Sequence, residues 1–379
     1  IDTVNMNRQF LSFMASIGVA SALTAWVTRR GRKSAGSSSS SAYASLVGNT
    51  PMVELKKLSN ILGCRILVKM ECLNPGGTGK DRACKYMLEA ADADIRRGAP
   101  VVEGTSGSTG ISLACMCRAL NAPLYVVLPD DQAAEKRVLL EGLGAEVRVV
   151  PSAAISNKNH YVNRARALAE EVGGIFMNQF ENTANFMAHY TETGPEIWEQ
   201  TGGDVDAFVM SAGTGGTIAG VSKYLKEQSG RNGVVIALAD PNGSSLFNKV
   251  MYGVCFTPEQ AERTIRRHRY DSIVEGVGLD RVTANFSQAS IDTAFKVSDQ
   301  MVVEMAHWLL REEGLFVGSS SALNVAAACL QAKAMGPGHT IVTIICDSGQ
   351  RHLSRFWNPE YIGQYNLTWP NKNVVPSCL

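Results

Sequence analysis

The stretch Val68–Arg82 reads V-K-M-E-C-L-N-P-G-G-T-G-K-D-R and decides the fold, because a strand, a glycine-rich loop and a helix follow one another in it. A helical pattern begins at about Lys80, so this lysine is predicted at a helix N-terminus. The positive end of the helix dipole destabilises an ammonium group there. A lysine that loses its proton readily can attack a carbonyl group and form a Schiff base. Since a lone lysine in such a turn is more often a solvated surface residue, this hypothesis depends on the other motifs.

Composition sets broad limits on the class of protein. A chain of 379 residues can hold one large or two ordinary domains. The formal net charge of +1 gives no bulk electrostatic case for binding nucleic acid. Nine cysteines without a C-x-x-C pair are typical of reduced thiols in a cytosol-like compartment. The six histidines are too dispersed to suggest a metal site, so no metal and no role is predicted for them.

The N-terminal region contains 18 uncharged residues, Phe10–Val27, followed by a basic cluster between Arg29 and Lys33. At 1.5 Å per residue a helix of this length spans about 27 Å, barely enough for a hydrocarbon core of about 30 Å. Basic residues after the segment favour a membrane anchor in residues 1–33 with the catalytic body in the cytosol. The segment resembles the N-terminal anchors of mitochondrial outer-membrane proteins. A presequence that is cleaved on entry into the mitochondrial matrix is the alternative.

Residues 34–41 are rich in serine and are predicted to form a flexible linker. From residue 42 onward, short apolar runs alternate with amphipathic helical patterns. The runs predicted as strands lie at 66–70, 100–104, 123–129, 146–151, 207–213, 234–240 and 339–347. They lack polar–apolar alternation, which is typical of parallel strands covered by helices on both faces. The sequence therefore predicts an α/β protein, whose ligands bind where strands end in loops that open helices.

Two glycine-rich loops follow predicted strands. The first, Glu103–Gly110, reads E-G-T-S-G-S-T-G and suits a carboxylate or a phosphate, although plain turns also look like this. The second, Ser211–Gly220, reads S-A-G-T-G-G-T-I-A-G and offers backbone amides at a helix N-terminus to a phosphate. It lacks the features of a Walker A loop and of a dinucleotide-binding loop, so the phosphate of a smaller cofactor fits better.

A third loop, Gly314–Asn324, reads G-L-F-V-G-S-S-S-A-L-N and places hydroxyl groups at the head of an apolar helix. An ordinary N-cap is the simpler interpretation of its serines.

In this order, the four stretches resemble the cysteine synthase and cystathionine β-synthase family of fold-type II pyridoxal-phosphate enzymes. The resemblance runs from about Ala44 to Trp357 and includes N-Q-F-E-N-T-A-N at 178–185, T-G-P-E-I-W at 193–198 and C-D-S-G-Q-R at 346–351. It implies a two-lobed α/β fold like that of the tryptophan synthase β chain, and a homodimer. The N-terminal lobe, 42–190, would carry the lysine and the loop Glu103–Gly110, here called the substrate loop. The C-terminal lobe, 191–379, would carry the loop that contains Gly213–Thr217, here called the phosphate loop.

The resemblance also implies roles for the matching residues. Lys80 would form the Schiff base with pyridoxal phosphate and then act as general base. Ser320 would face the pyridine nitrogen, and a hydroxyl there favours elimination of a β-substituent over transamination. The residues that would hold the phosphate are Gly213, Thr214, Gly215, Gly216 and Thr217. The residues that would bind the substrate carboxylate are Thr105, Ser106, Thr109 and Gln179.

Two departures from the family pattern stand out. Ser108 replaces the usual asparagine beside the 3′ oxygen of the cofactor, so a hydroxyl on a shorter arm would donate there. V-E-G-V-G-L-D-R at 274–281 replaces G-I-G-A-G-F. In that loop, Asp280 and Arg281 either recognise a charged substrate or pair with each other on the surface.

The implied function is β-replacement by a cysteine synthase, which forms L-cysteine and acetate from O-acetyl-L-serine and sulfide. A cysteine desulfhydrase is an alternative, and so is a synthase that uses phosphoserine, with Arg281 as an anion contact. A hypothesis of another class is a weakly catalytic, membrane-tethered scaffold that binds a partner such as a serine acetyltransferase tail. The presence of Lys80 and of the complete phosphate loop favours an enzyme.

Overall fold

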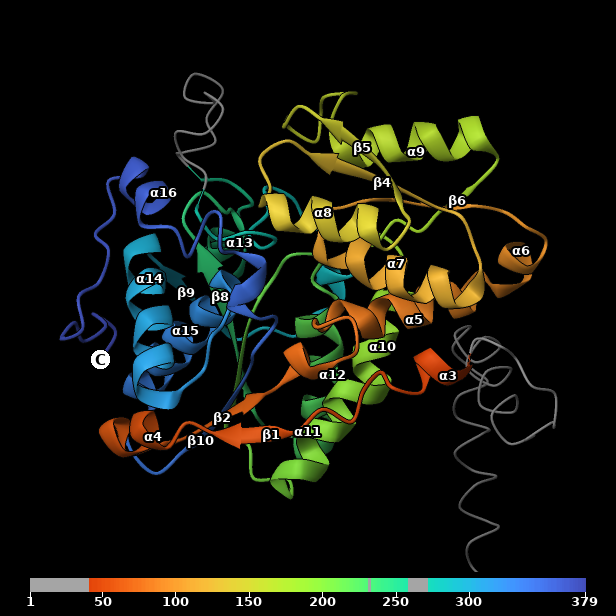
Figure 1. Ribbon diagram of the computed structural model, residues 1–379. Coiled ribbons are helices and arrows are strands. Elements are labelled where there is room, and N and C mark those ends of the chain that lie inside the picture. The colour runs from red at the N-terminus through yellow and green to blue at the C-terminus, as the bar shows by residue number, and fades with distance from the viewer. Residues whose placement is uncertain (1–40, 231–232, 258–271) are drawn as a thin grey trace, which may run out of the picture. The chain divides into compact units, whose positions relative to one another are not determined.

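Residues 41–230, 233–257 and 272–379 are described in the computed structural model (Figure 1). The predicted membrane anchor at 1–33 and residues 34–40 of the predicted linker lie outside these ranges. Within them, we find no helix that combines the length and the apolar character needed to cross a bilayer. The body of the chain, Ala42–Leu379, is built on two separate sheets.

The larger sheet has six strands in the order β1-β2-β10-β7-β8-β9. In this spatial order the strands are β1 (Met52–Glu54), β2 (Arg65–Lys69), β10 (Thr340–Ile344), β7 (Ala207–Ser211), β8 (Val235–Pro241) and β9 (Thr293–Val297). All of them run parallel except β1, which pairs antiparallel with β2 at the edge. The start of the predicted N-terminal lobe thus belongs to the larger sheet through the pairing of β2 with β10. The division into lobes at residue 190 stays a prediction.

The smaller sheet has four parallel strands in the order β5-β4-β3-β6. Its strands are β5 (Glu146–Val150), β4 (Leu124–Pro129), β3 (Val101–Gly104) and β6 (Ile175–Phe176). Helix α9 packs on one face, whereas α7 and α8 pack on the other (Figure 1). The prediction that every strand is covered on both faces is wrong for β5, whose side chains stay partly exposed because the strand lies at the sheet edge.

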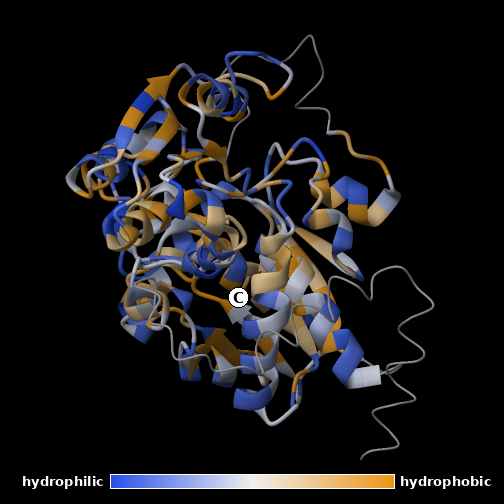
Figure 2. Cartoon of the chain, turned by 90° about the vertical axis from the view of Figure 1, so that its right-hand side faces the viewer, coloured by the Kyte–Doolittle hydropathy of each residue, from blue (hydrophilic) through white to orange (hydrophobic). Residues whose placement is uncertain are grey.

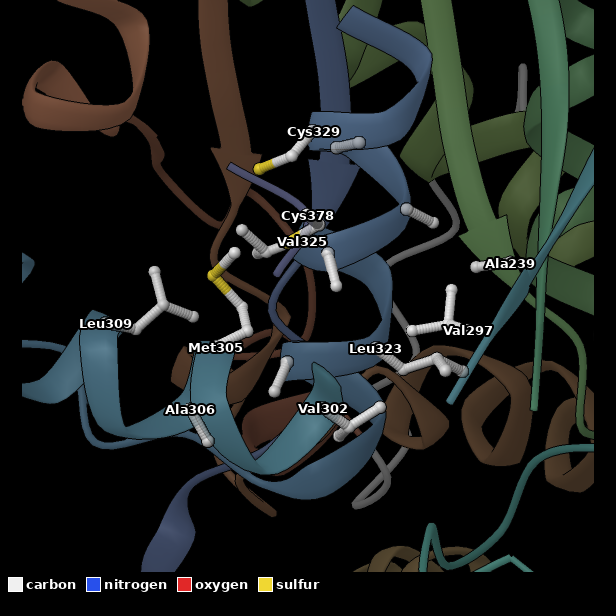
Figure 3. Close-up of a cluster of buried hydrophobic side chains, with 14 of the residues drawn as sticks. Ala239, Val297, Val302, Met305, Ala306, Leu309, Leu323, Val325, Cys329 and Cys378 are labelled. Atoms are coloured by element: carbon white, nitrogen blue, oxygen red, sulfur yellow. The ribbon is translucent and has the colours of Figure 1, made fainter. Parts of the chain in front are cut away.

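The helices before β7 are α3 (Ser41–Ala44), α4 (Lys56–Leu62), α5 (Lys80–Ala90), α6 (Asp92–Arg96), α7 (Ser108–Leu120), α8 (Ala134–Gly142), α9 (Tyr161–Val172), α10 (Ala184–Ala188) and α11 (Gly194–Thr201). The later helices are α12 (Gly216–Ser229), α13 (Leu246–Tyr252), α14 (Asp299–Trp308), α15 (Ser319–Met335) and α16 (Pro359–Gln364). Helix α15 is buried along almost its whole length and packs against four strands of the larger sheet and against α14. Figure 3 shows this core, in which Val302 and Met305 of α14 lie near Leu323 and Val325 of α15.

All seven predicted strands are present, and the α/β class is confirmed. The sequence analysis did not identify β1, β6 and β9, which have two to five residues each. Figure 2 shows the physical basis of the successful predictions, because apolar residues follow the strands while polar residues dominate many loops and outer helix surfaces.

Candidate active site

Lys80 is the first residue of α5, so the predicted start of this helix is confirmed. The turn before it is fixed by the next residue, because the Asp81 carboxylate accepts hydrogen bonds from the Gly76 amide at 2.5 Å and from the Ser112 hydroxyl. A methyl group on Gly76 would overlap with this carboxylate, which explains a glycine at that position. Burial raises the pKa of Asp81 to about 6, although both hydrogen bonds act in the opposite direction.

The lysine lines a cavity of about 240 Å³ that lies where four loops meet. Besides Lys80, the predicted site residues in its wall are Ser106, Ser108, Thr109, Gln179, Gly213, Thr214, Gly215, Thr217 and Ser320. The other two predicted residues lie close behind the wall. Thr105 accepts a hydrogen bond from the Gly107 amide at 3.0 Å, and Gly216 packs against the side-chain amide of Asn185. The structure therefore brings all four sequence motifs to one place.

The loop Gly213–Thr217 connects β7 to α12 and has the geometry of an anion site. Gly215 has a φ of 87°, a left-handed conformation that favours glycine. A side chain on Gly213 would overlap with the Gly276 carbonyl oxygen. Within the described ranges no side chain caps α12, so its first amide groups stay available to a ligand. This backbone cradle fits a phosphate group.

Two side chains hold the hydroxyl groups of this loop in place. Asn185 donates a hydrogen bond to the Thr214 hydroxyl at 2.8 Å, and the His189 ring lies 3.1 Å from the Thr217 hydroxyl. Burial lowers the pKa of His189 to about 3, so its imidazole is neutral near pH 7. The loop therefore receives hydrogen bonds without gaining a fixed charge from this histidine.

The substrate loop is tied to Gln179 by a chain of hydrogen bonds. The Thr109 hydroxyl donates to the Gln179 side-chain oxygen at 2.5 Å, and the Gln179 amide donates to the Gly104 carbonyl at 2.9 Å. The same amide donates to the Glu103 carboxyl at 3.2 Å. Burial raises the pKa of Glu103 to about 8, so this carboxyl holds a proton at neutral pH. Glu103 thus supports the site from behind as a neutral group.

We expect Glu103→Gln to be more stable than the natural protein at high pH. The unfolded carboxyl ionises near pH 4.5, whereas the folded one keeps its proton to about pH 8. The folded state therefore binds more protons between these values, so stability falls as pH rises through this window. The glutamine side chain does not titrate, so the variant lacks this pH dependence of stability. Thermal unfolding of variant and parent at pH 5 and pH 8.5 measures this effect. The melting temperature of the variant minus that of the parent should be at least ~2 °C larger at pH 8.5 than at pH 5. A constant difference contradicts the buried, protonated carboxyl.

Ser320 lies in the first turn of α15, at the cavity wall. The N-cap of this helix is Gly318, so the interpretation of Ser320 as an ordinary cap is wrong. The neighbouring Ser321 hydroxyl accepts a hydrogen bond from the Cys346 amide at 2.9 Å, which fixes the head of α15 against the segment that follows β10. The Ser320 side chain lines the cavity, where it is hydrogen-bonded to the Cys346 thiol.

Sequence reasoning missed a set of charged side chains in the same wall: Lys136, Glu275, Asp347 and His352. His352 was assigned no role, yet its ring lies 3.0 Å from the Asp347 carboxylate and 3.4 Å from that of Glu275. Burial lowers the pKa of His352, but Asp347 and Glu275 outweigh burial and raise the pKa to about 8. His160 also lines the cavity. Positions so far apart in the chain gave no spacing signal, and only the fold unites them.

Asp280 and Arg281 do not form part of the wall. No ion pair joins these two described residues, so the prediction of a mutual pair is wrong. The Arg281 guanidinium instead lies over the Phe180 ring, 4.9 Å from its centroid, which is a cation–π contact. This position gives no support to Arg281 as an anion contact for a substrate inside the cavity.

Comparison with known proteins identifies the class first. A family described as "Pyridoxal-phosphate dependent enzyme" matches residues 43–347, so the chain is a pyridoxal-phosphate-dependent enzyme. "Cysteine synthase 2" of Schizosaccharomyces pombe is 48% identical over 345 residues, which cover 87% of this chain and 85% of the relative. "Cysteine synthase 2" of Emericella nidulans is 49% identical over 335 residues, which cover 82% of this chain and 78% of the relative.

A solved structure agrees with these relatives. The O-acetylserine-dependent cystathionine β-synthase of Helicobacter pylori superposes with a TM-score of 0.72 at 28% identity, covering 83% of this chain and 97% of that one. The chain belongs to the cysteine synthase and cystathionine β-synthase family of fold-type II enzymes, and the resemblance seen in the sequence is confirmed. When bound, pyridoxal phosphate supplies an electron-withdrawing ring that stabilises negative charge at the α-carbon of an amino acid. The glycine cradle at 213–217 fits its phosphate.

Proposed function

We propose that this protein is a cysteine synthase, which replaces the acetate group of O-acetyl-L-serine by sulfide. The observation that carries the proposal is the meeting of Lys80, the phosphate loop and the substrate loop at one cavity. Cysteine synthases at 48% and 49% identity support the reaction, and the O-acetylserine-dependent structural relative supports the acyl donor.

Each loop has a task in this reaction. The substrate loop, with Thr105, Ser106 and Thr109, orients the substrate carboxylate, and Gln179 holds this loop in place through its hydrogen bonds to Thr109 and Gly104. The Lys80 amine takes the proton from the α-carbon as a general base. The carbon–oxygen bond to acetate breaks, the sulfur of sulfide forms a carbon–sulfur bond in its place, and Lys80 returns the proton to the α-carbon. Ser320 would face the pyridine nitrogen of the cofactor and Ser108 would lie beside its 3′ oxygen, whereas the residues at 213–217 would hold its phosphate.

We expect O-acetylserine to be used at least ~10-fold more efficiently than O-phosphoserine, which corresponds to about 1.4 kcal/mol. The reason is electrostatic, because Lys136 and His352 already pair with Glu275 and Asp347. A phosphate dianion would therefore enter beside two carboxylates without an unpaired cation in this part of the wall. Steady-state formation of cysteine with each donor and sulfide measures the preference.

The same assay separates the competing functions. Faster release of sulfide from cysteine than synthesis of cysteine indicates a desulfhydrase. A preference for phosphoserine indicates the phosphoserine-using synthase. A protein with full cofactor content that acts on none of these substrates supports the scaffold hypothesis.

For localisation, we propose a mitochondrial protein. A cysteine synthase of Saccharomyces cerevisiae, 46% identical over 325 residues, carries a name that assigns it provisionally to mitochondria. The finer proposal of an outer-membrane anchor at residues 10–27, with the body facing the cytosol, rests on the sequence alone. Alkaline extraction and protease treatment of intact mitochondria distinguish this arrangement from a soluble matrix protein. The homodimer is proposed from the family, and light scattering measures it.

A further inference from the structure

A buried ion pair connects the two sheets across the cavity wall. Lys136 belongs to α8, which packs on the smaller sheet, whereas Glu275 precedes a loop that lies against the larger sheet. The side chains are only 3% and 7% exposed, and the Lys136 ammonium group contacts the Glu275 carboxylate directly. His352 and Arg355 each approach this carboxylate at 3.4 Å. Such a pair is costly to bury, so its position calls for a reason beyond stability.

The stem of Lys136 lies across the substrate loop. A Cβ atom on Gly107 would lie 2.5 Å from Lys136 Cδ, and Gly107 has a φ of 129° that favours glycine. The loop thus leaves room at Gly107 for the lysine. Since the ammonium group is held by Glu275, the lysine side chain reaches from α8 over the substrate loop to segment 275–278.

The segment 275–278 completes the contact from the opposite side. A Cβ atom on Gly276 would lie 3.5 Å from the Ser106 hydroxyl, and the Gly276 carbonyl packs against Gly213 of the phosphate loop. The Glu275 amide donates a hydrogen bond to the Ser319 hydroxyl at 3.2 Å, which fixes the segment to the head of α15. The segment therefore lies between the two loops that bind the cofactor phosphate and the substrate.

We propose that Lys136 and Glu275 are positioning residues that clamp the substrate loop against segment 275–278 and so set the affinity for the amino-acid substrate. The nature of the substrate rests on the proposed function. The clamp acts on the loop and not on the reacting atoms, so it affects substrate binding more than turnover.

The kinetic test compares Lys136→Met and Glu275→Gln with Arg137→Met. Arg137 lies on the same helix and pairs with Glu141 at an exposed position, so its variant controls for loss of a nearby ion pair. Both clamp variants should raise KM for O-acetylserine at least ~10-fold, change kcat less than ~3-fold and keep the cofactor absorbance of the holoenzyme. The double variant Lys136→Met, Glu275→Gln should raise KM no more than either single variant does, because the two residues act as one unit.

Hydrogen–deuterium exchange tests the clamp without any substrate. In the holoenzyme, Lys136→Met and Glu275→Gln should accelerate exchange of the amides at 104–110, and Arg137→Met should not. Unchanged exchange and a KM within ~2-fold of the parent overturn the proposal. If the parent acts on none of the tested donors, the proposed function fails, while exchange still decides the clamp. If a single variant does not fold, the double variant supplies both measurements.

Discussion

Replacing Lys80 with alanine should lower cysteine formation from O-acetylserine and sulfide by at least ~10³-fold, because both covalent attachment and general-base catalysis are lost. The lysine begins α5 and faces the cavity in which the phosphate and substrate loops meet. The turn that holds it depends on Asp81, which lies one position further along, so the alanine variant keeps the local hydrogen bonds. The expected defect is therefore chemical.

Two further variants sharpen this test. Lys80→Arg keeps a positive charge but forms no Schiff base, so it should be as inactive as the alanine variant. Lys56→Ala removes an exposed lysine of α4 and should leave the rate unchanged. Borohydride reduction of the parent, followed by peptide mapping, should label position 80 alone. Normal turnover in Lys80→Ala, or a label at another lysine, would refute the assignment of Lys80.

The part of the site that could be predicted from the sequence is the part built from local features. Each of the loops at 74–80, 103–110 and 211–220 follows an apolar strand and opens a helix, so strand, loop and helix are visible in one short stretch. The loops after β2 and β7 converge because both strands end at the same edge of the larger sheet. The loop at 103–110 follows β3 of the smaller sheet, so its arrival at the same cavity depends on how the two sheets pack, which the sequence does not state.

The clamp residues could not be predicted in this way. Lys136 lies in a helix rich in charged residues, where the sequence predicts that a lysine is exposed to solvent. Glu275 lies in a loop that resembled a surface turn. His352 was dismissed because no second histidine stands at a ligand spacing. These residues acquire their roles only through burial at the junction of the two sheets. Likewise, Arg281 carried the clearest charge signal in its loop, yet the structure places it on Phe180.

Substitution of Gly213 in the phosphate loop should strongly weaken cofactor binding. Gly213→Ala should weaken the binding of pyridoxal phosphate by ~10–100-fold, because overpacking of this kind costs about 1–3 kcal/mol. The added methyl group would overlap with the Gly276 carbonyl oxygen, which is backbone and cannot rotate away. Either the phosphate loop or segment 275–278 must move. Cofactor content after purification and fluorescence titration of the resolved protein with pyridoxal phosphate measure the loss.

The matched control is Gly363→Ala in α16. This glycine is exposed, a Cβ atom on it would meet nothing within 4 Å, and alanine is the better helix former. Its variant should bind the cofactor like the parent. Because segment 275–278 also carries half of the clamp, Gly213→Ala should accelerate amide exchange at 104–110 as well. Full cofactor affinity in Gly213→Ala would show that the phosphate lies elsewhere, and the glycine cradle would then need another explanation.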